Sequence, residues 1–404
     1  MKHVSKPPQS QVKQVLAAIV HIAISTTVMQ TNGAALAQGA ASGPSVNPVP
    51  PVATRSQVSV QVVASGLRHP WGLAFLPGGH FLITERPGRL RVVAPDGRMG
   101  PPLAGLPRLA VGGQGGLLDV ITDADFARNR RIFFCYSEPA SPERGGSGNS
   151  TALASATLAP GATALQEVTV LFSQRPKVAS QLHFGCRIVQ APDGNLFLTL
   201  GERYGRKDDA QGLDNHLGKV VRLAPTGGAA PGNPLADRAG ALPEIWSWGH
   251  RNPQGAAWGP DGRLWIHEHG AQGGDEINRP EPGRNYGWPV ITYGENYGGG
   301  KIGVGTAKPG MEQPLHYWVP SIAPSGMAFL TSDRYGADWR GSLFVGSLKF
   351  TRLHRLELRG GRVVRDEYLL DSLGARIRDV RQGPDGWIYL LTDSPNGQLL
   401  RLAH

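Results

Sequence analysis

The stretch from Gly249 to Pro289 holds the densest group of side chains that could do chemistry. Its imidazoles could transfer protons, its carboxylates could bind cations, and its guanidinium groups could bind an anion. Buried polar groups destabilise a fold unless they are paired, so this density beside glycines and aromatics predicts a site rather than core. The side chains concerned are Arg251, Asn252, His267, Glu268, His269, Asp275, Glu276 and Tyr286.

Basic residues far away in the sequence could join this stretch in one pocket. Lys349 lies in GSLKF. Arg376 and Arg378 are two positions apart, so on a strand both side chains point to the same face. With Arg251 they would form a cationic pocket suited to acids or to a polyanionic ligand. The alternative is that each is solvated or paired with a nearby acid, for which the candidates are Asp379 and Glu268.

A candidate general base is His183, in SQLHFGCRIV, because a neutral imidazole can accept a proton from an alcohol. Gln114 is a second isolated polar residue, in the glycine-rich run Gly112–Gly116. That run lacks the G-x-G-x-x-G order and the strand–helix context of a dinucleotide loop. The chain also has no Gly-x-Ser-x-Gly elbow and no His-Glu-x-x-His helix.

Two kinds of metal site are possible here. Asp275, Glu276 and Tyr286, with carbonyl groups around Gly270 and Ala271, offer the oxygen ligands that Ca²⁺ prefers, although their spacing fits no EF-hand. His267 and His269 would share one face of a strand and could bind zinc, but no third ligand is evident. The residue types favour calcium. Zinc at His267 and His269 is the alternative.

Repeated short segments predict the elements that position these residues. Six segments, several opening with Pro-Asp-Gly, combine a turn with alternating apolar residues, as in APDGNLFLTLGE and GPDGWIYLLTD. The chain has 55 glycines and 33 prolines, which argues against a helical protein. We therefore predict an all-β fold, a six-bladed β-propeller whose long inter-strand loops form the active site at one end of the channel. Ser56–Val63 would close the ring beside Gln398–Leu402, and a pair of β-sandwiches is the competing architecture.

The N-terminus has the pattern of an export signal. Three lysines precede a mostly apolar run, and Ala35-Leu36-Ala37 forms a small-x-small cleavage site. The run is short and interrupted by polar residues, which favours a cleaved signal over a membrane anchor. We predict a signal peptide at 1–37, a flexible leader at 38–56 and the propeller at 57–404. The mature protein is then periplasmic or secreted and does not span a membrane.

Charge and cysteine content exclude some partners and cofactors. The formal charge is +10, and removal of residues 1–37 leaves 38 basic against 31 acidic residues, or +7. The basic residues are dispersed and not interleaved with aromatics, so we expect no nucleic-acid partner. Cys135 and Cys186 cannot form a Cys-x-x-Cys-His haem site or a cysteine-rich metal centre. The sequence does not decide whether they pair with each other.

These motifs resemble a known family. The chain is similar to the soluble pyrroloquinoline quinone (PQQ)-dependent glucose/sorbosone dehydrogenases, and most closely to their aldose sugar dehydrogenase branch. The likeness covers about Val60 to Leu402, and family members are six-bladed propellers. The motifs that carry it are LRHPWGLAFLP, GGQGGLLDV, HFGCR, EIWSWGHRNPQG, HEHGAQGGDEIN, NYGWP, PSGMAF, GSLK and RIRDV.

The resemblance implies an oxidoreductase that converts the C1 hydroxyl of aldose sugars to lactones. His183 would take the hydroxyl proton while hydride passes from C1 to the quinone. Lys349 would polarise the quinone oxygens. His269 stands where the aldose branch has His and the glucose-specific branch has Gln. The residues placed by the resemblance at the cofactor are Gln114, Arg251, Asn252, His269, Tyr297, Ser321, Lys349, Arg376 and Arg378.

The resemblance also implies two calcium ions. One would bridge the cofactor and the carbonyl groups of Gly270 and Ala271, and a structural ion would use Glu276 and Tyr286. Asp275 falls where the family often has an acid near the site. One departure is visible: the expected His-Phe-Gly-Gly-Arg is His-Phe-Gly-Cys-Arg here, which adds bulk and oxidation sensitivity at Cys186.

Electrons would leave to a separate acceptor, a quinone or cytochrome, because the chain encodes no haem site. A calcium-dependent propeller lactonase or other hydrolase is an alternative that leaves the cationic residues unexplained. A non-catalytic sugar-binding propeller is another, in which His183 would have no catalytic role.

Overall fold

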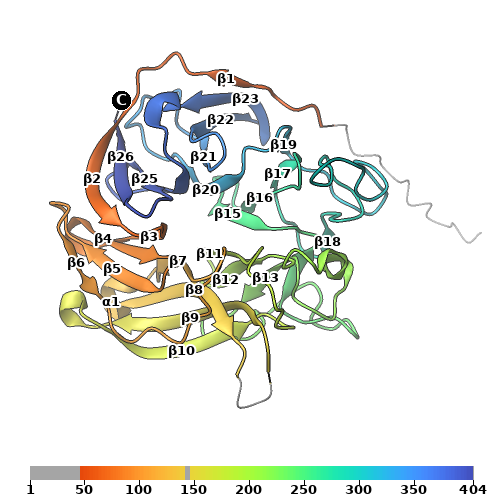
Figure 1. Cartoon of the computed structure of the whole chain (residues 1–404), viewed down its shortest axis with the longest axis horizontal. Coiled ribbons are helices and arrows are strands. Elements are labelled where there is room, and N and C mark those ends of the chain that lie inside the picture. Colours follow the sequence, from red (N-terminus) through yellow and green to blue (C-terminus); the bar gives the residue numbers. More distant parts are fainter. Residues whose placement is uncertain (1–45, 142–145, 404) are drawn as a thin grey trace, which may run out of the picture. The chain divides into compact units, whose positions relative to one another are not determined.

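The structure, a computed structural model, describes residues 46–141 and 146–403. Its strands form six sheets in a ring (Figure 1). The first strand of each sheet contacts the first strand of the next, in the order β3, β7, β11, β15, β20, β24 and back to β3. The predicted six-bladed β-propeller is therefore confirmed. The predicted signal peptide, residues 1–37, lies outside the described residues.

The first three blades follow one another along the chain. Blade 1 contains β3 (Pro70–Leu76), β4 (His80–Glu85), β5 (Arg89–Val93) and β6 (Met99–Pro102). Blade 2 contains β7 (Leu117–Thr122), β8 (Arg131–Pro139), β9 (Asn149–Leu158) and β10 (Leu165–Ser173). Blade 3 contains β11 (Gly185–Gln190), β12 (Leu196–Leu200), β13 (Lys219–Leu223), β14 (Ile245–Trp248) and β18 (Arg284–Asn285).

Of the last three blades, blades 5 and 6 each include a strand from the N-terminal part of the chain. Blade 4 contains β15 (Pro253–Trp258), β16 (Leu264–Glu268), β17 (Asp275–Asn278) and β19 (His316–Trp318). Blade 5 contains β20 (Pro324–Phe329), β21 (Leu343–Ser347), β22 (Leu353–Arg359), β23 (Arg362–Leu369) and β1 (Pro51–Ala53). Blade 6 contains β24 (Ile377–Gln382), β25 (Ile388–Thr392), β26 (Gly397–Ala403) and β2 (Ser59–Leu67).

Helices are short and lie between strands. There is one α-helical turn, α1 (Phe126–Asn129), among the described residues. The 3₁₀ turns are η1 (Pro77–Gly79), η3 (Pro160–Ala162), η4 (Lys207–Gln211) and η5 (Asp371–Leu373). No helix in the described ranges is long and apolar enough to cross a membrane.

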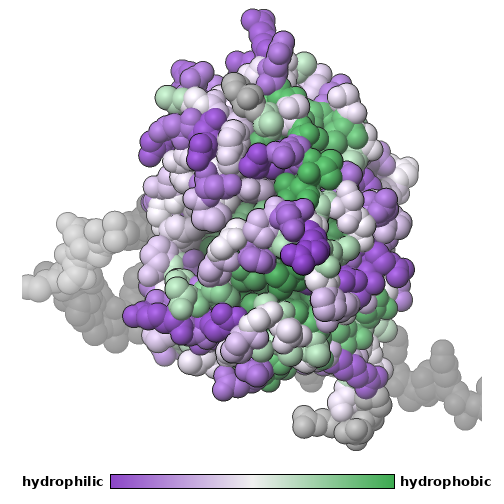
Figure 2. Space-filling view, turned by 90° about the vertical axis from the view of Figure 1, so that its left-hand side faces the viewer, coloured by the Kyte–Doolittle hydropathy of each residue, from purple (hydrophilic) through white to green (hydrophobic). Residues whose placement is uncertain are grey.

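The N-terminal strand closes the ring. β2 pairs antiparallel with β26, with Val60 opposite Leu402, as predicted. The preceding residues are also placed in part: β1 pairs in parallel with the outer strand β23, inside the range 38–56 that the sequence suggested as a leader. Figure 2 shows the side of the molecule that faces left in Figure 1, where hydrophobic groups lie in bands among hydrophilic ones. On β2, for example, Val62 is 51% exposed.

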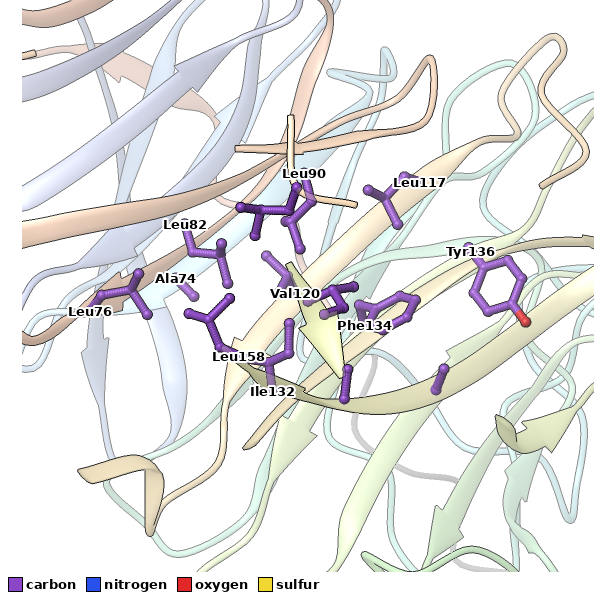
Figure 3. Close-up of a cluster of buried hydrophobic side chains, with 14 of the residues drawn as sticks. Ala74, Leu76, Leu82, Leu90, Leu117, Val120, Ile132, Phe134, Tyr136 and Leu158 are labelled. Carbon is purple, nitrogen blue, oxygen red and sulfur yellow. The ribbon is translucent and has the colours of Figure 1, made fainter. Parts of the chain in front are cut away.

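The apolar core lies between neighbouring blades, as the alternation of each strand predicts. Between blades 1 and 2, side chains of β3 and β4 pack against side chains of β7, β8 and β9 (Figure 3). Each fully buried Leu, Ile or Phe here contributes roughly 1.5–3 kcal/mol. Members of this cluster include Ala74, Leu76, Leu82, Leu90, Leu117, Val120, Ile132, Phe134, Tyr136 and Leu158.

An ion-pair network joins the innermost strands at the channel. Arg187 on β11 places Nη1 3.2 Å from Oδ1 of Asp119 and 2.9 Å from Oδ1 of Asp379. Arg381 pairs with the same two acids at 2.6 and 3.0 Å. Both acids are fully buried, and complete pairing makes such burial tolerable. Asp379 therefore pairs with Arg187 and Arg381, rather than with the arginines that the sequence suggested.

Candidate active site

A cavity of about 260 Å³ lies where segments from all six blades converge. Five of the predicted site residues line it: Gln114, Asn252, His269, Arg376 and Arg378. The sequence therefore identified segments that meet in space, although they are separated by up to 264 positions. The other lining residues are Trp71, Arg86, Gly113, Leu118, Phe184, Gly185, Gln254, Ala323, Leu348 and Asp393.

His183 lies beside this cavity, directly before the lining residues Phe184 and Gly185. Its side chain is buried, and its Nδ1 is 3.0 Å from Oε2 of Glu202. Burial lowers the pKa of His183, and the nearby Arg251 adds to this effect, while Glu202 opposes it. The net direction is downward, so the ring is neutral at neutral pH.

The hydrogen bond with Glu202 defines what the imidazole can do. A carboxylate only accepts hydrogen bonds, so the pairing assigns the proton of neutral His183 to Nδ1. Nε2 then carries the lone pair and is the acceptor for a substrate proton. The sequence analysis did not identify Glu202. The signal was an acid two residues after the end of the apolar strand LFLTL.

Two predicted cofactor residues also hold the backbone around His183. Oε1 of Gln114 accepts a hydrogen bond from the N–H of His183 at 2.8 Å. Oδ1 of Asn252 accepts one from the N–H of Gly185 at 3.1 Å. Because each amide oxygen is engaged with backbone, the amide NH₂ groups are the donors that Gln114 and Asn252 can offer to the cavity.

Close packing explains the glycine run around Gln114. At Gly116, which has φ +153°, a Cβ would lie 1.8 Å from the carbonyl oxygen of Arg86. At Gly115 a Cβ would lie 2.7 Å from Cζ of Phe184. The run therefore requires glycine because neighbouring chain segments approach it closely, and it places the side chain of Gln114 against the turn that carries His183.

Guanidinium groups from blade 6 supply positive charge. Nη2 of Arg378 is 2.7 Å from Oδ2 of Asp393, and Nη2 of Arg376 is 3.6 Å from the same oxygen. Burial alone would raise the pKa of Asp393, but Arg378, His69 and Arg376 outweigh it and hold that pKa well below its usual range. Nε of Arg378 is buried without a hydrogen-bond partner among the described residues.

Arg251 is buried between the cavity and a smaller pocket. Its Nη1 donates to the carbonyl oxygen of His269 at 3.2 Å and also to that of Gly270. Its guanidinium lies over the ring of Trp288 at 5.2 Å, and its Nε has no partner in the described part of the chain. The structure thus brings Arg251 to one of the carbonyl groups proposed for calcium.

Lys349, Tyr297 and Ser321 are not among the residues that line the cavity. Lys349 is exposed, and its Nζ lies 5.2 Å from the centre of the Phe350 ring. Tyr297 is 62% exposed. The hydroxyl of Ser321 donates to Oδ2 of Asp275 at 2.7 Å, so these two residues hold each other.

His269 is a half-buried imidazole in the cavity wall. Its Nε2 lies 2.6 Å from the carbonyl oxygen of Pro324, which only accepts, so Nε2 carries the proton. Burial, with the charge of Arg251, lowers the pKa of His269 to about 3. The ring therefore links the end of β16 to the start of β20 by a hydrogen bond and adds no charge to the cavity.

Two acids, Glu268 and Glu276, line the small pocket of about 10 Å³ next to Arg251. Burial, with the charge of Glu268, raises the pKa of Glu276 to about 8. Such a volume holds about one small particle, such as a water molecule or an ion. Tyr286 also lines the pocket, but its hydroxyl donates to the carbonyl of Arg279 and accepts from the N–H of Glu281.

The carboxylate of Asp275 holds loops rather than lining a pocket. Besides Ser321, it accepts from the N–H groups of Gly270, Ile322 and Ala323 at 2.8–2.9 Å. Across the described ranges, no group of three or more His, Cys, Asp or Glu side chains is arranged to hold a metal ion. His267 and His269 therefore have no third ligand for zinc within the described ranges.

The two cysteines form a disulfide. Cys135 on β8 and Cys186 on β11 have their Cα atoms 5.9 Å apart, and both side chains are fully buried. The bond links blade 2 to blade 3. Cys186, the departure from the expected motif, is thus a structural residue three positions after His183.

Fold and site together define a six-bladed propeller enzyme with a cationic pocket beside an oriented imidazole. The chain belongs to the glucose/sorbosone dehydrogenase family, whose sequence pattern matches residues 67–401. It is similar to the aldose sugar dehydrogenase YliI of Escherichia coli strain K12, with 44% identity over 355 residues, which are 87% of this chain and 94% of that protein.

Solved structures agree with this relationship. The apo form of the soluble aldose sugar dehydrogenase from Escherichia coli is 43% identical and covers 86% of this chain and 99% of its own, with a TM-score of 0.83. The PQQ-bound aldose sugar dehydrogenase from Streptomyces coelicolor is 29% identical and covers 88% of this chain and 100% of its own, with a TM-score of 0.69. The chain is therefore a homologue of aldose sugar dehydrogenases, among which a PQQ-bound member is known.

Proposed function

We propose that this protein is an exported quinoprotein that oxidises the C1 hydroxyl of aldose sugars to lactones with PQQ. The single observation that carries the proposal is His183, a buried neutral imidazole oriented by Glu202 beside a cavity lined by arginines. Family membership and the PQQ-bound relative support the choice of reaction and cofactor.

The cavity fits a polyanionic planar cofactor. Among the described residues, three arginines and one acid, Asp393, line the cavity. Nε of Arg378 has no partner, so the pocket contains an unused buried donor as well as excess positive charge. Carboxylates of PQQ would satisfy both, with Arg376, Arg378 and Asn252 as the residues that hold it.

When bound, PQQ would supply a quinone that accepts the two electrons of the sugar as a hydride. The chain's own contribution is to bind the sugar beside His183 and to take its C1 hydroxyl proton at Nε2. Glu202 stabilises the imidazolium that then forms, because it already holds Nδ1–H. Gln114 keeps the base in place through the N–H of His183.

Calcium is proposed at the acidic side of the site. Glu276 is half-buried beside Glu268, and no basic side chain among the described residues pairs with it, so a Ca²⁺ ion would supply the missing charge. The carbonyl of Gly270 now accepts from Arg251, so an ion there would require that guanidinium to turn toward the cofactor. Ala271 and Tyr286 could contribute carbonyl oxygens.

Export and a separate electron acceptor complete the proposal. The N-terminal pattern at 1–37 and a disulfide between the two cysteines both suit an oxidising compartment outside the cytosol. The reduced cofactor must then pass its electrons to a quinone or a cytochrome.

The test is reconstitution. Apo-protein is mixed with PQQ and Ca²⁺, and reduction of an artificial dye is followed with glucose and other aldoses. We expect sugar-dependent dye reduction and an absorbance band from bound quinone. A protein that hydrolyses lactones but reduces no dye would point to a hydrolase, and sugar binding without turnover would point to a binding protein.

A further inference from the structure

The turn that carries His183 departs from strand geometry at three residues. His183, Gly185 and Cys186 have φ angles of +52°, +67° and +81°. The pairing of β11 with β12 is also irregular: Gly185 lies opposite Leu200, and the next pair is Ile188 with Leu198. Cys186 therefore sits in a β-bulge, in a backbone region that favours glycine.

Hydrogen bonds hold the first part of this turn. Gln114 and Asn252 bind its N–H groups, as described above. Nε of Arg203 donates to the carbonyl of Leu182 at 3.0 Å, and Oγ1 of Thr151 donates to that of Phe184 at 2.6 Å. These contacts act before residue 186.

The end of the turn is held differently. At the bulge the N–H of Arg187 binds Oγ1 of Thr199 at 3.0 Å rather than a partner in the regular ladder. The side chain of Cys186 is bonded to Cys135, whose strand β8 pairs with β9 without interruption from Arg131 to Pro139. The disulfide thus ties an irregular segment to a regular strand pair in the neighbouring blade.

We propose that the Cys135–Cys186 disulfide is a positioning clamp that sets the place of His183 relative to the cofactor pocket. The inference rests on the proposed role of His183 as the base. Two of the three arginines that line the cavity, Arg376 and Arg378, belong to blade 6, whereas the disulfide joins blades 2 and 3. Loss of the clamp therefore displaces the base and leaves cofactor binding intact.

The first test is the double variant Cys135→Ala/Cys186→Gly. Glycine adopts a φ of +81° readily, so the fold is kept while the covalent tie is lost. A displacement of about 1 Å can cost about 100-fold in rate, so we expect kcat to fall at least tenfold. The affinity for PQQ and the KM for glucose stay within twofold. An unchanged kcat overturns the proposal.

The matched control is Leu153→Ala. Leu153 is buried in the same cluster as both cysteines, so its truncation destabilises this region without cutting the disulfide. We expect a lower unfolding temperature with kcat within twofold of wild type. If Leu153→Ala lowers kcat as much as the double variant does, the disulfide acts only through stability and the proposal is wrong.

A second measurement uses the unmodified holoenzyme, in case the double variant does not fold. A water-soluble phosphine reduces the disulfide to two thiols and becomes the phosphine oxide with oxygen from water, and alkylation with mass spectrometry counts the thiols. We expect turnover to fall in step with the reduced fraction while the absorbance of bound quinone persists. Full turnover after complete reduction overturns the clamp.

A third readout separates this inference from the proposed function. NMR titration of the His183 ring needs neither sugar nor cofactor. Burial lowers the pKa of His183, so a ring released from its place should titrate closer to the ordinary value in the double variant. If wild type oxidises no aldose, the proposed function fails, but this shift still reports whether the disulfide positions the ring. An unshifted titration overturns the clamp.

Discussion

Oε2 of Glu202 lies 3.0 Å from Nδ1 of His183, with both side chains buried beside the cofactor pocket. The pairing assigns the imidazole tautomer, leaves Nε2 as the proton acceptor, and places a negative charge where the imidazolium will form. Burial lowers the pKa of His183 and Glu202 partly offsets that effect. The two residues should therefore behave as one unit in kinetics.

Glu202→Gln is predicted to lower kcat and to shift its pH dependence. The amide cannot stabilise the imidazolium, so kcat falls by roughly 10²-fold, within the range of general-base contributions. Neutral His183 is the active form, so the rate is lost as pH falls through its pKa. Loss of the Glu202 charge lowers that pKa further, and the acid limb of kcat should move to lower pH. Steady-state rates between pH 4 and 8 measure both effects.

His183→Ala serves as the reference for this variant. It should abolish turnover while PQQ affinity stays within twofold, because the imidazole is not among the residues that line the cavity. An acid limb in Glu202→Gln that moves to higher pH, or a His183→Ala protein with substantial turnover, would contradict the assignment of the base.

Arg378→Ala is predicted to weaken cofactor binding. A charge-assisted hydrogen bond is worth about 1.5–3 kcal/mol, which corresponds to roughly a 10- to 100-fold higher Kd for PQQ. Asp393 competes with the cofactor for the same guanidinium at 2.7 Å, so Asp393→Asn should instead lower the Kd. Equilibrium dialysis or titration of the quinone absorbance gives both values.

The control for charge alone is Arg359→Ala, since the Arg359 side chain is 77% exposed and pairs with Glu357 on blade 5. It should leave the Kd unchanged. Equal PQQ affinity in Arg378→Ala and wild type would remove Arg378 from the cofactor site.

Much of the fold could be predicted from local sequence, because each blade repeats a turn followed by alternating apolar residues. The closing pair of β2 and β26 was predictable for the same reason, as both are amphipathic strands at the two ends of the repeat. The predicted residues Gln114, Asn252 and Arg378 do meet, because a propeller brings the ends of its inner strands together.

The contacts between individual side chains could not be predicted in this way. Asp393 meets Arg378 because the start of β24 lies beside the end of β25 in their antiparallel pair, and the Cys135–Cys186 bond depends on Cα atoms 51 positions apart coming within 5.9 Å. The sequence also gave no sign that the amide oxygens of Gln114 and Asn252 accept hydrogen bonds from the turn that carries His183. Such details arise from three-dimensional contact rather than from residue type or spacing.

His269→Gln is predicted to reduce acid sensitivity. In the folded protein the pKa of His269 is about 3, against an ordinary value near 6.5, so the unfolded chain binds a proton first as pH falls. The contribution of His269 to the free energy of unfolding is fully present above about pH 6.5. It is lost as pH falls toward 3, at up to about 1.4 kcal/mol per pH unit. Glutamine can still donate to the carbonyl of Pro324 but does not titrate.

Urea unfolding at pH 7 and pH 4 measures the difference. Between pH 7 and pH 4, the free energy of unfolding of wild type should fall by about 3 kcal/mol more than that of His269→Gln, because pH 4 lies about 2.5 units below the ordinary histidine pKa. The control is His80→Gln, a half-buried histidine that does not line the cavity, which should follow wild type. Parallel pH profiles for wild type and His269→Gln would contradict the assignment of a neutral His269 ring.

Calcium is predicted to stabilise the protein through Glu276, and more strongly at higher pH. The folded pKa of Glu276 is about 8, against an ordinary 4.5, so without a cation the folded state holds a proton that the unfolded chain releases. Stability in a chelator should therefore be greatest below about pH 4.5 for this group and fall as pH rises through 8. Ca²⁺ replaces the proton, so its effect on Tm should be small at pH 5 and large at pH 8.

Glu276→Gln should abolish this pH-dependent effect, whereas Glu281→Gln, which changes a carboxylate 40% exposed, should not. A Ca²⁺ effect of the same size in Glu276→Gln and wild type would place the ion elsewhere.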